Sequence, residues 1–183
     1  MSKVGTFTFT ETELEGVKII EPRIFRDARG SFMEGFSYDS FLQAGIDMRI
    51  RQMNVSHSSQ GVLRGMHYQK NYPQAKLVKV TTGEIFDVAV DVRKDSSTYS
   101  KWFGVVLSEQ NKKQLYIPRG FAHGFIVLSE QAEFLYMVDN DYHPEDEAGI
   151  IWNDPSIGID WPLAKGMAPL LSDKDRLLKP LER

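Results

Sequence analysis

Short apolar or alternating segments, each bounded by turn residues, follow one another along most of this 183-residue chain. Residues 6–10 alternate strictly between threonine and phenylalanine, and glycine-containing turns near Gly30, Gly83 and Gly120 separate the later segments. Strand-like runs also lie at residues 17–20, 77–80, 85–92, 102–107, 124–128 and 132–138. Helical patterns are limited to residues 39–44 and a short segment that opens at Ser172. The pattern predicts an all-β antiparallel jelly-roll barrel or sandwich with a few short helices.

The composition fits a single domain over residues 1–183, because no repeat or low-complexity linker divides the chain. Hydrophobic residues make up 42% of the chain and charged residues 26%, which can supply a sizeable core. The net charge of −3 does not indicate binding to nucleic acid or to an anionic membrane. No apolar run approaches the ~18 residues of a membrane span, so a cytoplasmic location is expected. Cysteine is absent, which excludes disulfides, thiolate zinc sites and cysteine nucleophiles.

The N-terminal segment, residues 1 to about 12, contains a strand with no obvious hairpin partner in the sequence. Two interpretations stay open for it. The strand can form an edge of its own barrel, or it can add to a sheet edge of a second subunit. The second interpretation predicts a homodimer.

Two glycine-bounded histidines resemble the paired motifs of the cupin β-barrel superfamily. His67 lies in residues 61–69 (GVLRGMHYQ), and His123 ends residues 118–123 (PRGFAH). Metal-binding cupins place a second histidine two residues after the first, and a glutamate separated by six residues from the closing glycine. Those places hold Gln69 and Lys76 here, with Gly83 as the closing glycine. A lysine ammonium cannot complete a divalent-metal site, so the pattern predicts acid–base chemistry through His67 and Lys76 without a metal.

The two histidines each have a structural alternative. An isolated strand histidine usually only satisfies its own hydrogen bonds, but the nearby Arg64, Gln69 and Lys76 favour a base at His67. Strand alternation places Arg64 on the opposite face from His67 unless the glycine between them bends the strand. His123 either holds a turn by hydrogen bonds or belongs to the site. His57 and His143 lie in polar loops and are expected to be solvated.

Three further residues are candidates with open roles. Lys76 and Lys79 should point to opposite faces of one strand, although the pleat alone does not say which points inward. Tyr136 interrupts an apolar run, as a core tyrosine with a hydrogen-bonded hydroxyl or as a proton donor. Asp175 follows Ser172 by three residues, and this spacing favours a helix cap over a partner for a histidine. Arginines cluster in the first third of the chain, which weakly indicates an anionic ligand.

Taken in order, the motifs resemble the dTDP-4-dehydrorhamnose 3,5-epimerase family over nearly the whole chain. The segments that carry this resemblance are residues 25–30 (FRDARG), 52–54 (QMN), 62–69 (VLRGMHYQ), 86–93 (FDVAVDVR), 117–125 (IPRGFAHGF), 152–154 (WND) and 171–175 (LSDKD). The resemblance implies a metal-free cupin jelly roll without a cofactor, usually a homodimer with exchanged N-terminal strands. It also implies a dTDP-linked 4-keto-6-deoxy hexose as substrate, in the pathway to dTDP-L-rhamnose.

The resemblance also implies a role for each matching residue. His67 matches the base, Asp175 its orienting aspartate, Tyr136 the proton donor on the opposite sugar face, and Lys76 the lysine beside the C4 carbonyl. The implied role of Asp175 replaces the cap that spacing alone favours. Tyr142 matches the aromatic residue that stacks on thymine. The remaining substrate-contacting positions match Arg29, Glu34, Gln52, Asn54, Arg64, His123, Glu147 and Lys174.

Three rival functions stay open at this point. A sister epimerase that inverts only C3 or only C5 would carry the same catalytic residues. A metal-dependent cupin enzyme is opposed by Gln69 and Lys76. A non-catalytic cupin that binds sugar nucleotides would retain the binding residues without turnover.

Overall fold

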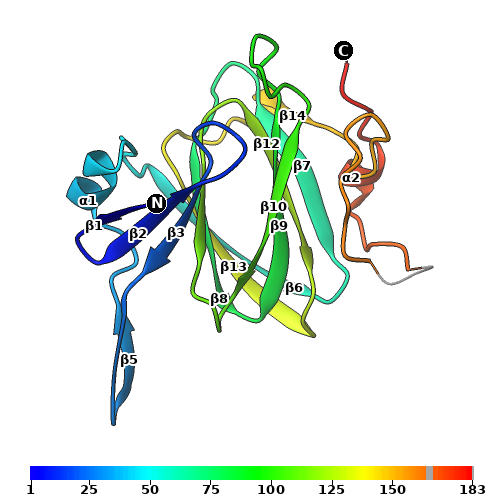
Figure 1. Ribbon diagram of the computed structural model, residues 1–183. Helices are drawn as coiled ribbons and strands as arrows, with labels where there is room; N and C mark the ends of the chain where they lie inside the picture. Colours follow the sequence, from blue (N-terminus) through cyan, green and yellow to red (C-terminus); the bar gives the residue numbers. More distant parts are fainter. Residues whose placement is uncertain (164–166, 183) are drawn as a thin grey trace.

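The computed structural model describes residues 1–163 and 167–182, and nearly all of its regular structure is β-strand. The larger sheet has seven strands in the order β1-β2-β3-β11-β8-β13-β6, with antiparallel pairing throughout. Its strands are β1 (Ser2–Val4), β2 (Phe7–Glu11), β3 (Lys18–Pro22), β6 (Gln52–Ser59), β8 (Lys76–Thr82), β11 (Gln114–Ile117) and β13 (Gln131–Val138). The expected all-β fold is confirmed, and Figure 1 shows the strands of the central body wrapping into a barrel.

The smaller sheet has five antiparallel strands in the order β10-β9-β12-β7-β14. They are β7 (Leu63–Gln69), β9 (Glu84–Asp91), β10 (Trp102–Ser108), β12 (Phe121–Val127) and β14 (Glu147–Gly149). The two histidine motifs lie on adjacent strands of this sheet, and His67 pairs directly with His123 in the register. Two segments that are far apart in the sequence are therefore neighbours in one wall of the barrel.

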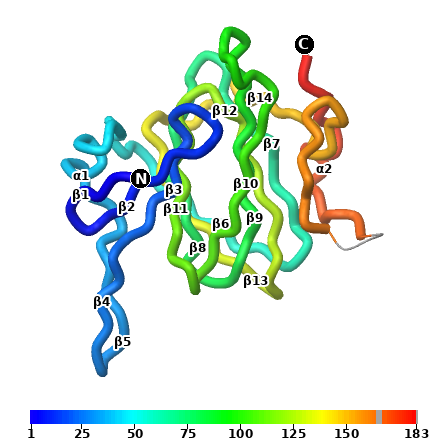
Figure 2. Tube along the Cα trace, viewed as in Figure 1, coloured from blue at the N-terminus to red at the C-terminus, as the bar shows by residue number. Residues whose placement is uncertain are grey.

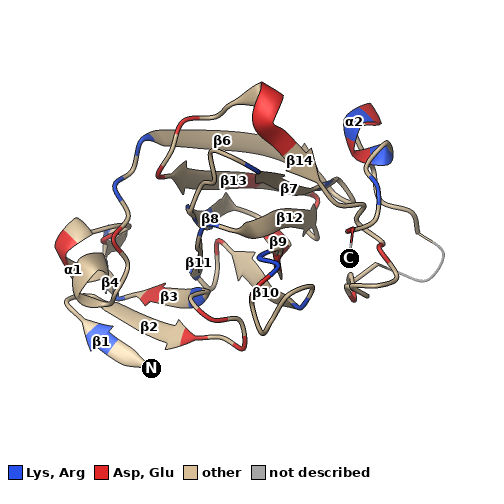
Figure 3. Cartoon of the chain, turned by 90° about the horizontal axis from the view of Figure 1, so that it is seen from above, with Lys and Arg blue, Asp and Glu red and all other residues tan. Residues whose placement is uncertain are grey.

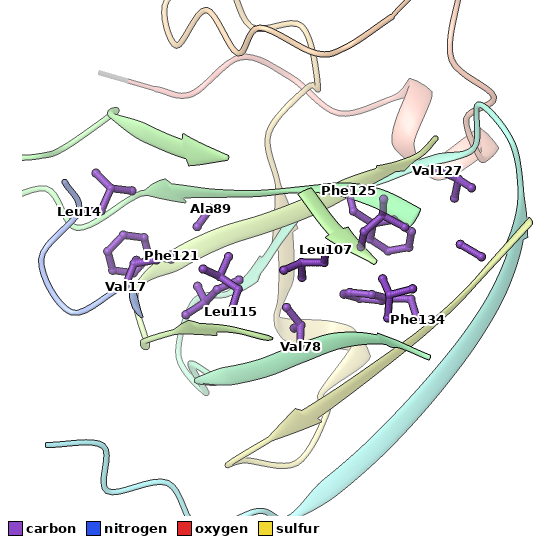
Figure 4. Close-up of a cluster of buried hydrophobic side chains, with 14 residues drawn as sticks. Leu14, Val17, Val78, Ala89, Leu107, Leu115, Phe121, Phe125, Val127 and Phe134 are labelled. Atoms are coloured by element: carbon purple, nitrogen blue, oxygen red, sulfur yellow. The ribbon is translucent and has the colours of Figure 1, made fainter. Parts of the chain in front are cut away.

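The space between the two sheets is filled by an apolar cluster to which both contribute. Val78, Leu115 and Phe134 come from the larger sheet, and Leu107 and Phe125 from the smaller one (Figure 4). Alternation along each strand turns these side chains inward, so burial of the shared apolar surface holds the sheets face to face. The cluster fills one part of the barrel interior, and the cavities described below occupy another part.

Each sheet is also covered on its outer face. The helix α1 (Tyr38–Gln43) packs Phe41 against Phe7 and Phe9 of the larger sheet, with Ser37 as its N-cap. On the smaller sheet, Ile150 and Trp161 of the C-terminal segment lie in a separate apolar cluster. This segment contains the 3-10 helix η1 (Pro144–Asp146) and the helix α2 (Asp173–Arg176). Figure 1 shows α1 and the C-terminal segment on opposite sides of the barrel.

A narrow hairpin leaves the body of the molecule between the larger sheet and α1. It consists of β4 (Ile24–Asp27) and β5 (Gly30–Met33), which pair only with each other. Figure 2 shows it as a thin arm that projects away from the barrel. Phe25 and Phe32 remain 40% and 70% exposed on this arm, a large apolar exposure for two neighbouring aromatic rings.

The N-terminal strand has partners within its own chain. β2 pairs with β1 on one side and β3 on the other. The sequence pattern did not show β1, because this strand has only three residues before the turn at Gly5, whose φ is +58°. Within one chain the strand lies near the edge of its own sheet, and its exchange with a second subunit stays a prediction. In the described residues, no helix has the length and apolarity needed to span a membrane.

Candidate active site

Two adjoining cavities of about 250 and 500 Å³ open between the sheets. They share five lining residues, which makes them two parts of one site: His67, Lys76, Tyr136, Tyr142 and Glu147. Gln52, Asn54 and Phe121 line the smaller part, and Arg64, His123, Lys174 and Asp175 line the larger. The site therefore gathers residues from both walls of the barrel and from the C-terminal segment.

The imidazole of His67 is held by a buried carboxylate. Its Nε2 lies 2.6 Å from Oδ1 of Asp175, whose side chain is only 4% exposed. Its Nδ1 faces the other way, 3.8 Å from a carboxylate oxygen of Glu147. Because Asp175 occupies Nε2, the second nitrogen is the one available to a substrate in the cavity.

Asp175 serves both roles that the sequence set against each other. Its backbone N–H donates to the Ser172 hydroxyl at the start of α2, while its carboxylate pairs with His67. Burial alone would raise the pKa of Asp175, but hydrogen bonds with His67, Ser172 and the backbone of Gly65 hold that pKa below its usual value. The cap was the correct local interpretation, and it positions the carboxylate that pairs with His67. Figure 3 shows α2 beside the end of the barrel where β7 and β14 meet.

Lys76 enters the site from the sheet opposite His67. It lies on β8, whereas Lys79 of the same strand lies against Gly35 outside the cavities. The expected opposite orientation of the two lysines is confirmed, and Lys76 is the inward one. Burial lowers the pKa of Lys76 to about 8, against smaller opposing effects of Asp87 and Glu147. The ammonium is thus charged at neutral pH but close to losing its proton.

Tyr136 lies on β13 in the larger sheet and borders both cavities. Its ring packs near Phe134, with centroids 5.7 Å apart. Burial raises the pKa of its hydroxyl above the ordinary value for tyrosine. The phenol therefore keeps its proton at neutral pH and faces a cavity whose opposite wall carries His67.

Glu147 connects several side chains at the mouth of the site. It accepts a hydrogen bond from Lys174 at 2.6 Å and a short one from the Tyr142 hydroxyl. The bond to Glu147 raises the pKa of Tyr142 to about 12. Tyr142 itself is 47% exposed, so much of its ring is free to receive a ligand.

The 3-10 helix between Tyr142 and Glu147 is fastened to the loop after β7. Asp146 accepts hydrogen bonds from the backbone N–H groups of Asn71 and Tyr72, and from the Asn71 side chain. His143 stacks on Tyr72 with centroids 4.1 Å apart, and its carbonyl accepts a bond from Gln69. The expectation of a solvated His143 was wrong, because a tertiary contact half-buries the ring. His57 is exposed, as expected.

Arg64 reaches the same cavity as His67, contrary to simple strand alternation. Gly65 between them has a φ of +119°, and the pairing of β7 with β12 shifts register at this point. Only a glycine fits at this bend, because a Cβ at position 65 would lie 2.6 Å from the backbone of Gly124. Arg64 donates to Ser58 and lines the larger cavity.

Two of the predicted site residues lie outside the cavities. Arg29 sits at the turn of the projecting arm, where it pairs with Asp27 at 2.6 Å. Glu34 follows the arm and accepts a hydrogen bond of 2.5 Å from Thr6. The other predicted residues line one or both cavities: His67, Lys76, Tyr136, Asp175, Gln52, Asn54, Arg64, His123, Tyr142, Glu147 and Lys174.

Sequence reasoning missed Asp87. It lies on β9, is fully buried, and sits 2.8 Å from Nε2 of His123. The sequence did carry a signal for it, because Asp87 lies inside the apolar run at residues 85–92. Burying an unpaired carboxylate costs free energy, so a charge at this position indicates a polar partner. In the described residues, no three histidine, aspartate or glutamate side chains form a group that could hold a metal ion.

Comparison with known proteins gives one consistent result. Residues 11–183 match the family model described as dTDP-4-dehydrorhamnose 3,5-epimerase. The enzyme of that name from Methanothermobacter thermautotrophicus is 51% identical over 178 residues, which cover 97% of this chain and 96% of that protein. The Escherichia coli K12 enzyme is 52% identical over 173 residues, which cover 93% and 92% of the two chains.

The solved structures agree with the sequences. The crystal structure of dTDP-6-deoxy-D-glucose-3,5-epimerase from Legionella pneumophila, in complex with dTDP-4-keto-L-rhamnose, superposes with a TM-score of 0.92 at 48% identity. The match covers 96% of this chain and 93% of that one. With a matching family model over most of its length and relatives at about half identity, this chain belongs to the dTDP-4-dehydrorhamnose 3,5-epimerase family.

Proposed function

We propose that this protein epimerises dTDP-4-dehydro-6-deoxy-D-glucose at C3 and C5 to give dTDP-4-dehydro-L-rhamnose, in dTDP-L-rhamnose biosynthesis. The observation that carries the proposal is the arrangement of a base, an acid and a cation around one cavity. His67 with Asp175 lies on one wall, Tyr136 lies on the other, and Lys76 projects between the sheets. The sequence relatives and the ligand-bound Legionella structure support this substrate class.

The first step is removal of the proton at C3 or C5, which both flank the C4 ketone. The free Nδ1 of His67 takes the proton, and the Asp175 carboxylate stabilises the imidazolium that forms. The electron pair of the broken carbon–hydrogen bond passes to the C4 oxygen and forms an enolate. The Lys76 ammonium stabilises that oxyanion, a role for which a buried fixed cation is well suited.

The second step returns a proton to the opposite face of the sugar. Tyr136 is the donor in this proposal, because its hydroxyl stays protonated at neutral pH and faces the cavity from the other sheet. Since acceptor and donor are different residues, each inversion exchanges the carbon-bound hydrogen with solvent. Two turns of this cycle, one at C3 and one at C5, complete the reaction.

The nucleotide part of the substrate is proposed to lie at the mouth of the site. Tyr142 offers an exposed ring to stack on thymine. Arg64 and Lys174 supply positive charge for the diphosphate. Polar contacts to the rest of the substrate come from Gln52, Asn54, His123 and Glu147.

We further propose a homodimer in which the projecting arm completes the site of a second subunit. Arg29 and the exposed Phe25 and Phe32 lie on the arm, away from the cavities of their own chain. Outward-facing Met53 and Val55 on the edge strand β6 are 60% and 56% exposed, which provides apolar surface for a second copy. Sedimentation equilibrium should give twice the chain mass; a monomer that turns over substrate would contradict this proposal. The cytoplasmic location stays a prediction.

Turnover in deuterated water tests the proposed reaction. We expect one deuterium at C3 and one at C5 of the product, located by NMR. Label at only one carbon would instead identify a mono-epimerase. Tight dTDP binding without any exchange would identify a non-catalytic sugar-nucleotide-binding protein.

Replacing Tyr136 with phenylalanine should separate exchange from inversion. The base and the Lys76 cation remain, so the substrate should still lose carbon-bound hydrogen to solvent, while inverted product falls by about 10²-fold or more. Proton NMR in deuterated water measures both rates together. Normal inversion by this variant would remove Tyr136 as the acid.

A further inference from the structure

A buried carboxylate that the proposed mechanism does not use lies beside the site. Asp87 on β9 is 0% exposed, and its Oδ1 is 2.8 Å from Nε2 of His123. Its second oxygen, Oδ2, is buried without a hydrogen-bond partner among the described residues. A buried carboxylate oxygen in this state is costly and needs an explanation.

The neighbouring histidine satisfies only half of this carboxylate. Burial lowers the pKa of His123, so its ring is neutral and donates its Nε2–H to Oδ1. The ring is stacked on Phe134, with centroids 5.9 Å apart, and is 7% exposed. A neutral, packed histidine fixes the orientation of Asp87 but does not balance its charge.

Lys76 comes from the other sheet and lines the larger cavity together with His123, the hydrogen-bond partner of Asp87. The electrostatic interaction between Lys76 and Asp87 favours the charged form of each, against a burial effect that opposes both charges. Because Oδ2 has no hydrogen-bond partner, this attraction does not consume an N–H of the lysine. The donors of the ammonium therefore remain free to point at a substrate oxygen in the cavity.

We propose that Asp87 is a positioning residue that keeps Lys76 protonated for its work on the C4 oxygen, through charge and without direct contact with the substrate. This inference rests on the proposed function. A lysine without a counter-charge would lose its proton closer to neutral pH in a buried cavity, and a neutral amine stabilises an oxyanion poorly. Asp87 thus sets the upper pH at which the enzyme works.

Ionisable groups other than Asp87 also lie near Lys76, and the test must separate their influence on its protonation from that of Asp87. Among the residues that the structure describes, Glu147 on β14 is the one other carboxylate that raises the pKa of Lys76, and its effect is smaller than that of Asp87. Glu147 is already paired with Lys174 and Tyr142. In the described part of the chain, the two cavities are also lined by eight further ionisable residues, which are Arg64, His67 and Tyr68 on β7, His123 on β12, Tyr136 on β13, Tyr142, and Lys174 and Asp175 on α2.

The Asp87→Asn variant tests the proposal, because asparagine keeps the shape and an acceptor for His123 but removes the charge. We expect kcat to fall about tenfold at about pH 9 but less than about twofold at neutral pH, with KM for the sugar nucleotide little changed. The basic limb of the pH–rate profile, expected near the Lys76 pKa of about 8 in the native enzyme, should move down by about one pH unit or more. In a Lys76→Met background, from which that limb should be absent, the same substitution should cause little further loss of kcat at any pH.

Asp91→Asn is the matched control. Asp91 lies on the same strand with equal burial, but it pairs with Arg93, Ser96 and Thr98 outside the cavities. Its loss should lower the unfolding midpoint and leave the basic limb in place. An unchanged limb in Asp87→Asn, or an equal shift in both variants, would overturn the role of Asp87. Such a result would leave the proposed function intact, since that stands or falls with deuterium exchange by the native enzyme.

A measurement on the native protein covers the case in which Asp87→Asn does not fold. The ¹³C signal of the Asp87 carboxyl group should report an ionised side chain at pH 7. It should also show an inflection near pH 8, when the Lys76 proton leaves. A protonated Asp87 at pH 7, or a signal that does not respond to this titration, would disprove the proposal.

Discussion

The His67→Asn variant is expected to lose both hydrogen exchange and epimerisation. Asparagine cannot accept the carbon-bound proton, and it leaves the Asp175 carboxylate without the imidazole to which it is bonded at 2.6 Å. A positioned general base contributes roughly 10²–10⁴-fold, so the rates at C3 and C5 should fall together by that factor. Deuterium incorporation measured by NMR, alongside product formation, tests both carbons in one experiment.

The histidine at position 57 provides the control for this substitution. His57 lies on β6 and is exposed outside the cavities, so His57→Asn should retain native rates. Binding of dTDP to His67→Asn should also persist, because Tyr142, Arg64 and Lys174 are untouched. Substantial exchange at either carbon in His67→Asn would show that another residue acts as base there.

The second large effect is expected from Lys76→Met. Methionine retains much of the volume of the side chain but removes the charge that stabilises the C4 oxyanion. Loss of one such interaction typically lowers kcat by about 10²–10³-fold, with a smaller effect on binding. Steady-state kinetics should therefore show the loss mainly in kcat. Lys79→Met, which changes the same residue type on the other face of β8, is the matched control and should retain activity.

The pKa of Lys76 gives this variant two further signatures. Activity of the native enzyme should decline as pH rises through about 8, because Lys76 then loses its proton, and this limb should be absent from Lys76→Met. The folded-state pKa lies below the ordinary 10.5, so the protonated lysine costs folding free energy below about pH 8. Thermal unfolding at pH 7 should therefore show Lys76→Met to be at least as stable as the native protein. A strongly destabilised variant would instead show that Lys76 has a mainly structural role.

The case of Asp175 shows where local sequence reasoning reaches its limit. The spacing from Ser172 correctly predicted a helix cap, because a cap depends on residues three positions apart. The pairing of Asp175 with His67 spans 108 positions, and no local pattern contains it. Only the resemblance to a family implied it in advance. The same holds for Asp87, whose partners His123 and Lys76 come from two other strands.

Arg64 and Arg29 illustrate two further limits of prediction from the sequence. Alternation alone gave the wrong face for Arg64, because a positive φ at Gly65 and a register shift override the pleat. The exact φ of a glycine is not encoded by its neighbours alone. Arg29 was predicted at the site, yet it lies on an arm that leaves the body of its own chain. Its predicted role depends on a second copy, which one chain cannot display.

The sequence by itself determined the all-β architecture and singled out His67, Lys76 and Tyr136 as candidate residues, while metal-free acid–base chemistry stays a prediction. These follow from strand periodicity, turn residues and the lysine at position 76, which are properties of short segments. The tertiary structure decided which groups meet: His67 with Asp175, Lys76 between two sheets, and Asp87 behind His123. Hydrogen bonding and charge interactions act over a few ångströms of space, so they depend on how distant segments pack rather than on their order in the chain.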